Sequence, residues 1–196
     1  MRSESAFARA LLSKAKPSSG EQTVTWHQQL ALAPGIYQIR VAVRERSTGL
    51  LGSTRQWIEI PATSSRFALS SLFLGERKQS SAIEQSQPSG PIPITVDVDR
   101  RFARSSVLRY QTYVYNAALA GGQTDVRVHA SVLRNRRQVM SIAPAIVPSV
   151  GDLRQLAYWS EIPLQSLPPG QYVLAVTATD RVANTSTTQQ VRFSVE

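Results

Sequence analysis

The sequence predicts an all-β protein made of antiparallel β-sandwich units. In several segments apolar residues alternate with polar ones with a period of two, and Pro-Gly and Gly-Gly turns separate those segments. The apolar residues are rich in Val, Ile, Leu and Tyr, which suit the pleated surface of a sheet. With 196 residues, the chain is long enough for one large domain or two small sandwich domains.

The N-terminal third predicts a tail followed by an incomplete sandwich. Residues 1–21 carry an interrupted apolar run, too short for the core of a signal peptide, and predict a tail or a short helix. Residues 22–61 predict a partial unit with a strand over 23–32, a turn at Pro34 and Gly35, and a hairpin of strands 36–44 and 53–60. Residues 61–65 predict a linker.

Residues 66–196 predict one complete sandwich domain. We expect strands over 66–74, 94–98, 107–115, 124–134, 138–142, 158–164, 172–179 and 189–195. Between them we expect a long loop over 75–93, turns at 120–122 and at 136–137, and a connecting loop over 143–156.

An internal repeat relates the two predicted units. Residues 32–60 align without gaps on residues 167–195, an offset of 135 (167 − 32). In each copy a proline fixes φ, a glycine takes positive φ, and a tyrosine opens the next strand. These residues are Pro34, Gly35 and Tyr37 in the first copy, and Pro169, Gly170 and Tyr172 in the second. We expect each tyrosine ring in a core and each hydroxyl bonded to backbone, as in the tyrosine corner of immunoglobulin-like sandwiches.

The repeat sharpens the predicted fold class to an immunoglobulin- or fibronectin-III-like sandwich, one complete unit preceded by a partial one. About three strands cannot close two sheets and bury both inner faces. The partial unit therefore either packs on the second unit or belongs to a longer polypeptide.

Several short motifs carry a resemblance to a known family. They are Leu-x-Pro-Gly-x-Tyr-x-x-x-Val-x-Val-Arg at 32–44, Phe-Ala-Leu-Ser-Ser-Leu at 67–72, Arg-Phe at 101–102, Val-Leu-Arg-Tyr at 107–110, Val-Tyr-Asn at 114–116, and the segment from Leu167 to Arg181. Over most of residues 30–196 the chain resembles the C-terminal β-sandwich region of bacterial von Willebrand factor A domain-related proteins.

The resemblance implies an accessory, extracytoplasmic region, secreted or in the cell envelope, that supports adhesion or protein contacts. The family's N-terminal A domain binds a metal through an Asp-x-Ser-x-Ser motif. No such motif occurs in this sequence, so no metal site is carried over.

The chain is basic, with 22 Lys and Arg against 13 Asp and Glu, a formal charge of +9. Two interpretations stay open: a compositional bias that aids solubility, or a basic surface with an anionic partner. The candidate surface residues form two clusters, Arg100, Arg101 and Arg104 in one, and Arg134, Arg136 and Arg137 in the other. Neither is interleaved with exposed aromatic residues, which disfavours nucleic acid as the partner.

The residues of catalytic and metal sites are scarce. There is no cysteine, the two histidines are far apart, and neither a Gly-x-Ser-x-Gly elbow nor a phosphate-binding glycine loop occurs. Asp97 and Asp99 share a strand face and could ligate Ca²⁺, but Arg100 and Arg101 follow directly, so an arginine-paired edge is the favoured interpretation. We therefore expect neither enzyme activity nor a cofactor.

The leading functional hypothesis is a structural and interaction module that contacts a protein partner or the rest of a larger polypeptide. Trp57 has the opposite strand parity to Ile58 and Ile60, which predicts that it faces away from its own unit, for packing between units or as a sugar-stacking platform. Carbohydrate binding through exposed Trp and Arg is the first alternative, and charge-driven nucleic-acid binding is the second. No apolar run approaches the roughly 18 residues that a membrane helix needs.

Overall fold

The computed structural model describes residues 30, 32–60, 66–77 and 96–196. Their regular secondary structure is entirely β-strand, which confirms the predicted all-β class. The chain divides into two compact units, Met1–Ser64 and Ser65–Glu196, and each is described by itself. The predicted tail at 1–21 and most of the predicted strand over 23–32 lie outside the described residues. The finer immunoglobulin-like class stays a prediction.

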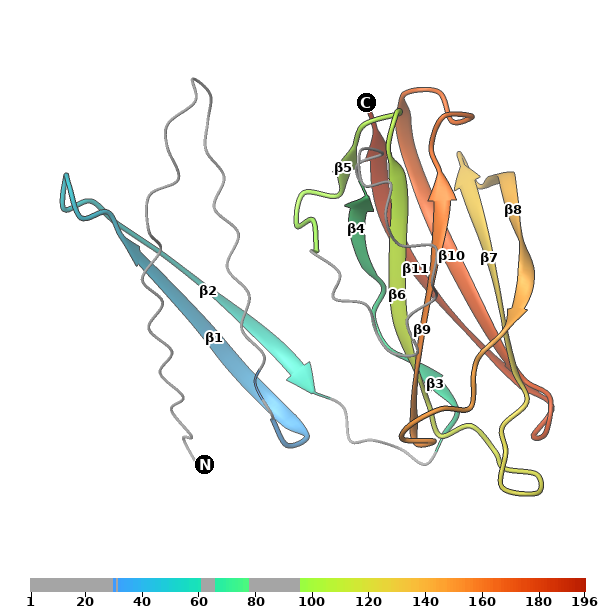
Figure 1. The fold of residues 1–196 in the computed structure, drawn as a ribbon. Coiled ribbons are helices and arrows are strands. Elements are labelled where there is room, and N and C mark those ends of the chain that lie inside the picture. The colour runs from blue at the N-terminus through green and yellow to red at the C-terminus, as the bar shows by residue number, and fades with distance from the viewer. Residues whose placement is uncertain (1–29, 31, 61–65, 78–95) are drawn as a thin grey trace. The chain divides into compact units, whose positions relative to one another are not determined.

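The first unit is described as one hairpin of two ten-residue strands, β1 (Gly35–Arg44) and β2 (Leu51–Ile60) (Figure 1). Arg44 pairs with Leu51 at the end nearest the turn. The turn is closed by Gly49 N, which donates to the carbonyl of Glu45 at 2.9 Å. This confirms the hairpin predicted over 36–44 and 53–60.

The second unit is a sandwich of two sheets (Figure 1). Its strands are β3 (Ala68–Leu69), β4 (Phe73–Arg77), β5 (Arg101–Phe102), β6 (Val107–Tyr115), β7 (Val126–Arg134), β8 (Arg137–Ile146), β9 (Gln155–Pro163), β10 (Gly170–Asp180) and β11 (Thr185–Val195). One sheet has the order β5-β11-β10-β7-β8, in which β5 runs parallel to β11 and all other neighbours are antiparallel. In the other sheet β9 pairs with the whole length of β6, so β3 and β4 share the opposite edge of β6.

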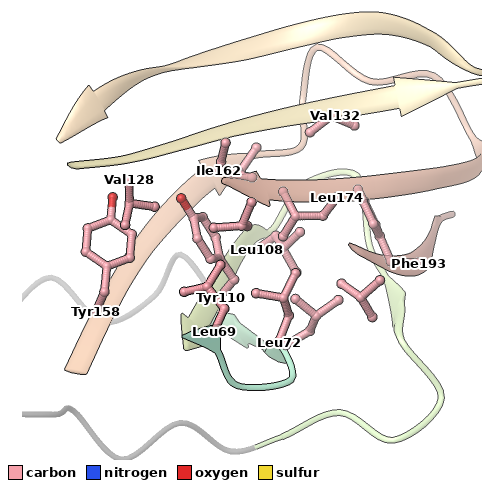
Figure 2. Close-up of a cluster of buried hydrophobic side chains, with 14 of the residues drawn as sticks. Leu69, Leu72, Leu108, Tyr110, Val128, Val132, Tyr158, Ile162, Leu174 and Phe193 are labelled. Atoms are coloured by element: carbon pink, nitrogen blue, oxygen red, sulfur yellow. The ribbon is translucent and has the colours of Figure 1, made fainter. Parts of the chain in front are cut away.

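Alternate residues of the two sheets meet in one hydrophobic core. Every second residue of β10 from Tyr172 to Ala178 is buried, as is every second residue of β6 from Leu108 to Val114. Figure 2 shows part of this layer, with side chains from both sheets: Leu69, Leu108, Tyr110, Tyr158 and Ile162 from one, Val128, Val132, Leu174 and Phe193 from the other, and Leu72 from the segment between β3 and β4. Each fully buried aliphatic side chain of this size contributes about 1.5–3 kcal/mol, so this layer is the main source of stability.

The strand predicted over 66–74 is in fact two short strands, β3 and β4, with a break over residues 70–72 that begins at Ser70. The Ser70 hydroxyl accepts a hydrogen bond from Tyr113 N at 3.0 Å, and the Thr112 hydroxyl donates to the Ser70 carbonyl at 3.3 Å. A side chain thus replaces part of the backbone ladder. The apolar pattern continues across the break, which is why the prediction of one strand was wrong.

Two predicted loops were placed too widely. The loop predicted over 143–156 is wrong at both ends, because β8 continues to Ile146 and β9 begins at Gln155. Pro144 is tolerated inside β8 because β8 is the edge strand of its sheet and because Pro144 lies at a register shift, between the pairs Val128–Ala145 and Ala130–Ile142, where it has no regular ladder partner. The loop predicted over 75–93 begins too early, since β4 ends at Arg77. Of the strand predicted over 94–98, the described part keeps a single bridge between Val96 and Gly75.

Candidate interaction surfaces

The two repeated hairpins have the same strand register. Gly35 pairs with Ile60, and Gly170 pairs with Val195. Adding 135 to both members of any β1–β2 pair gives a β10–β11 pair, so all ten pairs of the first hairpin have a counterpart in the second. The sequence repeat is therefore also a structural repeat.

The repeated tyrosines fasten the start of each hairpin in the same way. The Tyr37 hydroxyl donates to the carbonyl of Ala33 at 2.7 Å, and the Tyr172 hydroxyl donates to that of Pro168 at 2.5 Å. Each acceptor lies four residues before its tyrosine. The predicted bond from tyrosine to backbone is thus present in both hairpins. The predicted burial of the ring holds for Tyr172 but is wrong for Tyr37, which is only partly buried.

Arg134 seals the corner of the second hairpin. Its guanidinium lies 5.5 Å above the Tyr172 ring and donates to the carbonyl of Pro169 at 3.3 Å. A Cβ added at Gly170 would lie 2.8 Å from Arg134 Nη2, and the φ of Gly170 is 149°. Glycine at this position therefore serves both the backbone conformation and the close approach of Arg134.

The inner faces of the two hairpins differ in burial. In the second hairpin β7 pairs with the edge of β10 that faces away from β11. Leu174, Val176 and Ala178 are fully buried under the other sheet. Their counterparts in the first hairpin are Ile39, Val41 and Val43, whose exposed fractions are 39%, 37% and 59%. An apolar face of the same design is thus covered in one unit and open in the other.

Trp57 lies on the opposite face of the first hairpin, as its strand parity predicted. It pairs across the hairpin with Gln38, and 62% of its surface is exposed. The next pair along is Arg40 with Arg55, directly opposite each other. Trp57 therefore shares an exposed sheet face with Arg40 and Arg55, at the neighbouring pair of positions.

The two predicted arginine clusters lie at the same end of the five-stranded sheet, with strands β11 and β10 between them. Arg101 pairs with Ser194 on β11, and Gly170 pairs with the neighbouring Val195. At the same end, Arg134 of β7, which is the neighbour of β10, pairs with Arg137 of β8. Arg100, Arg101 and Arg192 line one shallow depression at this end together with Asp99 and Glu196.

Contacts within the sandwich occupy part of this basic end. Arg101 forms an ion pair with Glu196, and Arg104 Nε donates to the carbonyl of Gln165 at 2.9 Å. Arg136 lies in the β7–β8 turn and is exposed, whereas Arg137 already belongs to β8, so the turn predicted at 136–137 is centred one residue too late. This end of the sheet carries its own counter-charges.

Asp97 has a structural role in a turn. Its Oδ1 accepts hydrogen bonds from the backbone N–H groups of Asp99 and Arg100, both at 3.0 Å.

The ring nitrogen Nε2 of His129 is hydrogen-bonded to the Ser141 hydroxyl at 3.0 Å. Within the described ranges, no three His, Cys, Asp or Glu side chains gather in a way that could hold a metal ion.

Trp159 is already stacked within the sandwich. The Arg109 guanidinium lies 5.3 Å from its ring, and the Glu161 carboxylate accepts from Arg109 Nη2 at 2.6 Å and from Nε at 2.9 Å. The indole of Trp57 is far more open to a ligand than that of Trp159. Trp26 lies outside the described residues.

Sequence reasoning missed the block formed by Gln38, Arg40, Arg55 and Trp57. Its members lie on two strands up to 19 residues apart (57 − 38), and their proximity depends on the pairing register. The alternation of Gln38 and Arg40 along β1 was visible in the sequence, but the residues opposite them were not.

The sequence matches no known protein-family model, and no curated protein is significantly similar to it. In the part of the chain that the structure describes, no helix has the length and apolar character needed to cross a membrane.

Proposed function

We propose that this chain is a non-catalytic interaction module that binds the β-strands of a protein partner on the inner face of the β1–β2 hairpin. The observation that carries the proposal is the internal comparison. The same hairpin, in the same register, has its inner face buried in the second unit and open in the first.

The physical argument starts from the marginal stability of a hairpin alone. A two-stranded hairpin in water is at best marginally stable. Burying side chains such as Ile39, Val41 and Val43 contributes up to about 1.5–3 kcal/mol each. A partner that covers this face thus stabilises itself and the hairpin together.

The second unit also indicates what the partner must supply. There, β7 pairs antiparallel with β10 from Val173 to Asp180 and turns Val128, Ala130 and Val132 inward. The equivalent edge of β1 has no strand partner among the described residues. A strand with alternating small apolar residues fits that edge, and adding a strand to an open edge is an established mode of protein recognition.

A second copy of the hairpin is a poorer occupant. Face-to-face pairing of two hairpins covers the apolar side chains but leaves the edge of β1 without a strand. A partner that supplies strands adds backbone hydrogen bonds along that edge as well.

The resemblance to the C-terminal region of bacterial von Willebrand factor A domain-related proteins supports the same role. On this proposal the chain acts as an accessory β-sandwich region of a larger secreted or envelope protein. The sandwich of the second unit is then the stable scaffold.

Site-specific photo-crosslinking in the protein's own cells tests the proposal. A photo-reactive residue at Val41 reports on the inner face, and one at Ala42 reports on the outer face one position away. We expect Val41, but not Ala42, to crosslink to one protein, at a segment with alternating apolar residues. The same adducts from both positions, or no protein adduct from Val41, would refute the proposal.

A further inference from the structure

The outer face of the β1–β2 hairpin has a composition that the hairpin itself does not require. It consists of five cross-strand pairs: Ile36 with Glu59, Gln38 with Trp57, Arg40 with Arg55, Ala42 with Ser53, and Arg44 with Leu51. Among these residues Glu59 alone is acidic, and three are arginines. The face is therefore basic and carries one large exposed aromatic ring.

Arg40 and Arg55 are an unfavourable pair for the hairpin alone, because like charges directly opposite each other destabilise a sheet. Such a local conflict is typical of a functional site, where a ligand offsets the repulsion. An anion placed between the two guanidinium groups would do so.

Two further side chains extend this arginine pair into a block. Arg40 Nε donates to Gln38 Oε1 at 2.6 Å, which orients the amide and leaves its NH₂ group as a donor. Trp57 stands directly opposite Gln38. The block of Gln38, Arg40, Arg55 and Trp57 thus presents two guanidinium groups, one amide donor and one indole on adjacent positions.

The second hairpin provides an internal comparison. At the equivalent positions it has Val173 for Gln38, Ala175 for Arg40, Gln190 for Arg55 and Arg192 for Trp57, in the same register, so it has one arginine and no pair of them. That face of the second hairpin also lies away from the core. A hairpin of this kind therefore needs no arginine pair on its solvent-facing side. The difference between the two faces points to a ligand of the first.

We propose that this block binds an acidic polysaccharide. The indole of Trp57 packs on the apolar C–H face of a sugar ring, and Gln38 donates to a ring hydroxyl. The guanidinium groups of Arg40 and Arg55 hold a uronate carboxylate, for which the planar fork of arginine is well shaped. The chain's formal charge of +9 draws a polyanion toward it.

The same block is less suited to single-stranded nucleic acid. Proteins that bind single strands stack successive bases on several aromatic side chains. Trp57 is the one aromatic residue among the outer-face pairs. One indole suffices for one sugar ring, so the glycan is the favoured ligand. This site is independent of the inner-face proposal, since it lies on the opposite side of the strands.

The test is titration of the full chain with polygalacturonate, with its methyl ester as a neutral match and with an oligo(dT) strand as a third arm. We expect binding to polygalacturonate and at least about tenfold weaker binding to the ester. The double variant Arg40→Ala, Arg55→Gln carries the residues of the second hairpin, so it preserves the strand pairing. It should lose about tenfold in affinity, as should Trp57→Ala.

The matched control is Arg136→Gln, Arg137→Gln, which removes the same charge from another surface. It should change the affinity less than about threefold. An equal loss in the control would reduce the binding to non-specific charge and overturn the proposal. So would an absence of polygalacturonate binding, or a tighter, Trp57-dependent binding of oligo(dT).

Discussion

Asn184 occupies the position in the second hairpin that Gly49 occupies in the first, and both have left-handed backbones, with φ of 51° and 75°. The two turns also begin alike, with Glu45 and Asp180 at equivalent positions. The repeat therefore extends to backbone conformation. Glycine and asparagine are the two residues that adopt this conformation most readily.

Replacement of Asn184 tests this equivalence. Asn184→Ala should lower the free energy of unfolding by about 1 kcal/mol, because alanine in a left-handed conformation costs about 1–2 kcal/mol. Asn184→Gly should leave it nearly unchanged. Urea unfolding of the full chain measures both, with Gln190→Ala in an extended strand as the control. Equal stability of the alanine and glycine variants would contradict the assigned backbone conformation.

Arg136 occupies the least favourable position for its residue type in the β7–β8 turn. Asn135 and Arg136 have φ of 51° and 65° and lie between the paired residues Arg134 and Arg137, which defines a type I′ turn. Asn-Gly is the preferred sequence for this turn. Arg136→Gly should therefore raise the free energy of unfolding by about 0.5–1 kcal/mol. The control Arg137→Gly, one residue later and inside β8, should lower it; a gain in the control would show that the turn is elsewhere.

The sequence was sufficient to predict the strands with strict alternation. The hairpin of β1 and β2, the central strand β6 and the closing hairpin of β10 and β11 follow directly from a period of two. The break at Ser70 was not predictable, because it depends on a side-chain hydrogen bond from a strand about 40 residues away. The extension of β8 through Pro144 was missed because proline is tolerated in a strand at an edge or a bulge, and both depend on how the sheet is assembled.

For the candidate surfaces, the sequence identified residue types but not neighbours. Strand parity alone placed Trp57 on the face of the hairpin opposite to Ile58 and Ile60, where the register has it. Its proximity to Arg40 and Arg55 required the register of the hairpin. Likewise, Arg101 and Arg137 are 36 residues apart (137 − 101), and the strand order brings them to one end of the sheet.

Tyr110 carries a hydroxyl that the core does not use. The side chain is fully buried, and its hydroxyl forms no well-aligned hydrogen bond among the described residues, although Ser160 and Tyr158 lie close enough to influence it. Tyr110→Phe should therefore keep or raise the free energy of unfolding, by up to about 1–3 kcal/mol, the cost of burying an unpaired polar group. The control Tyr172→Phe removes a hydroxyl bonded to Pro168 and should lose about 1 kcal/mol. A larger loss for Tyr110→Phe than for Tyr172→Phe would contradict this account.

The same tyrosine predicts a loss of stability in alkali. Burial, and to a lesser degree the neighbouring Tyr158, raises the pKa of Tyr110 above its ordinary value of 10.0. Because the pKa is raised in the folded state, the stability of the fold is unaffected by this group below about pH 10, where the phenol is neutral in both states. The stability falls as the pH rises further, since the unfolded chain then loses the proton first. Above that pH the group should cost the folded state up to about 1.4 kcal/mol per pH unit. Urea unfolding at about pH 9, 10 and 11 should show a shallower decline for Tyr110→Phe than for the wild type, and identical slopes would contradict the prediction.

Asp180 is a buried carboxylate that fastens two loops to the end of β10. It is 1% exposed. Its Oδ1 accepts from Val182 N at 2.9 Å and Ala183 N at 3.1 Å, and its Oδ2 accepts from Ala118 N at 2.7 Å. Asp180→Ala leaves these three donors without their acceptor and should lower the free energy of unfolding by about 3–5 kcal/mol, since each bond to a charged group is worth about 1.5–3 kcal/mol and such losses overlap.

The variant Asp180→Asn distinguishes the contributions of the two loops to stability. The amide keeps one oxygen acceptor but turns an NH₂ group toward either the turn after β10 or Ala118 N, so about half of the loss is expected. Hydrogen exchange of the full-length variants locates the effect, because whichever N–H loses its acceptor should exchange faster. Unchanged exchange at Ala118, Val182 and Ala183 in Asp180→Ala would mean that these loops are held by other contacts.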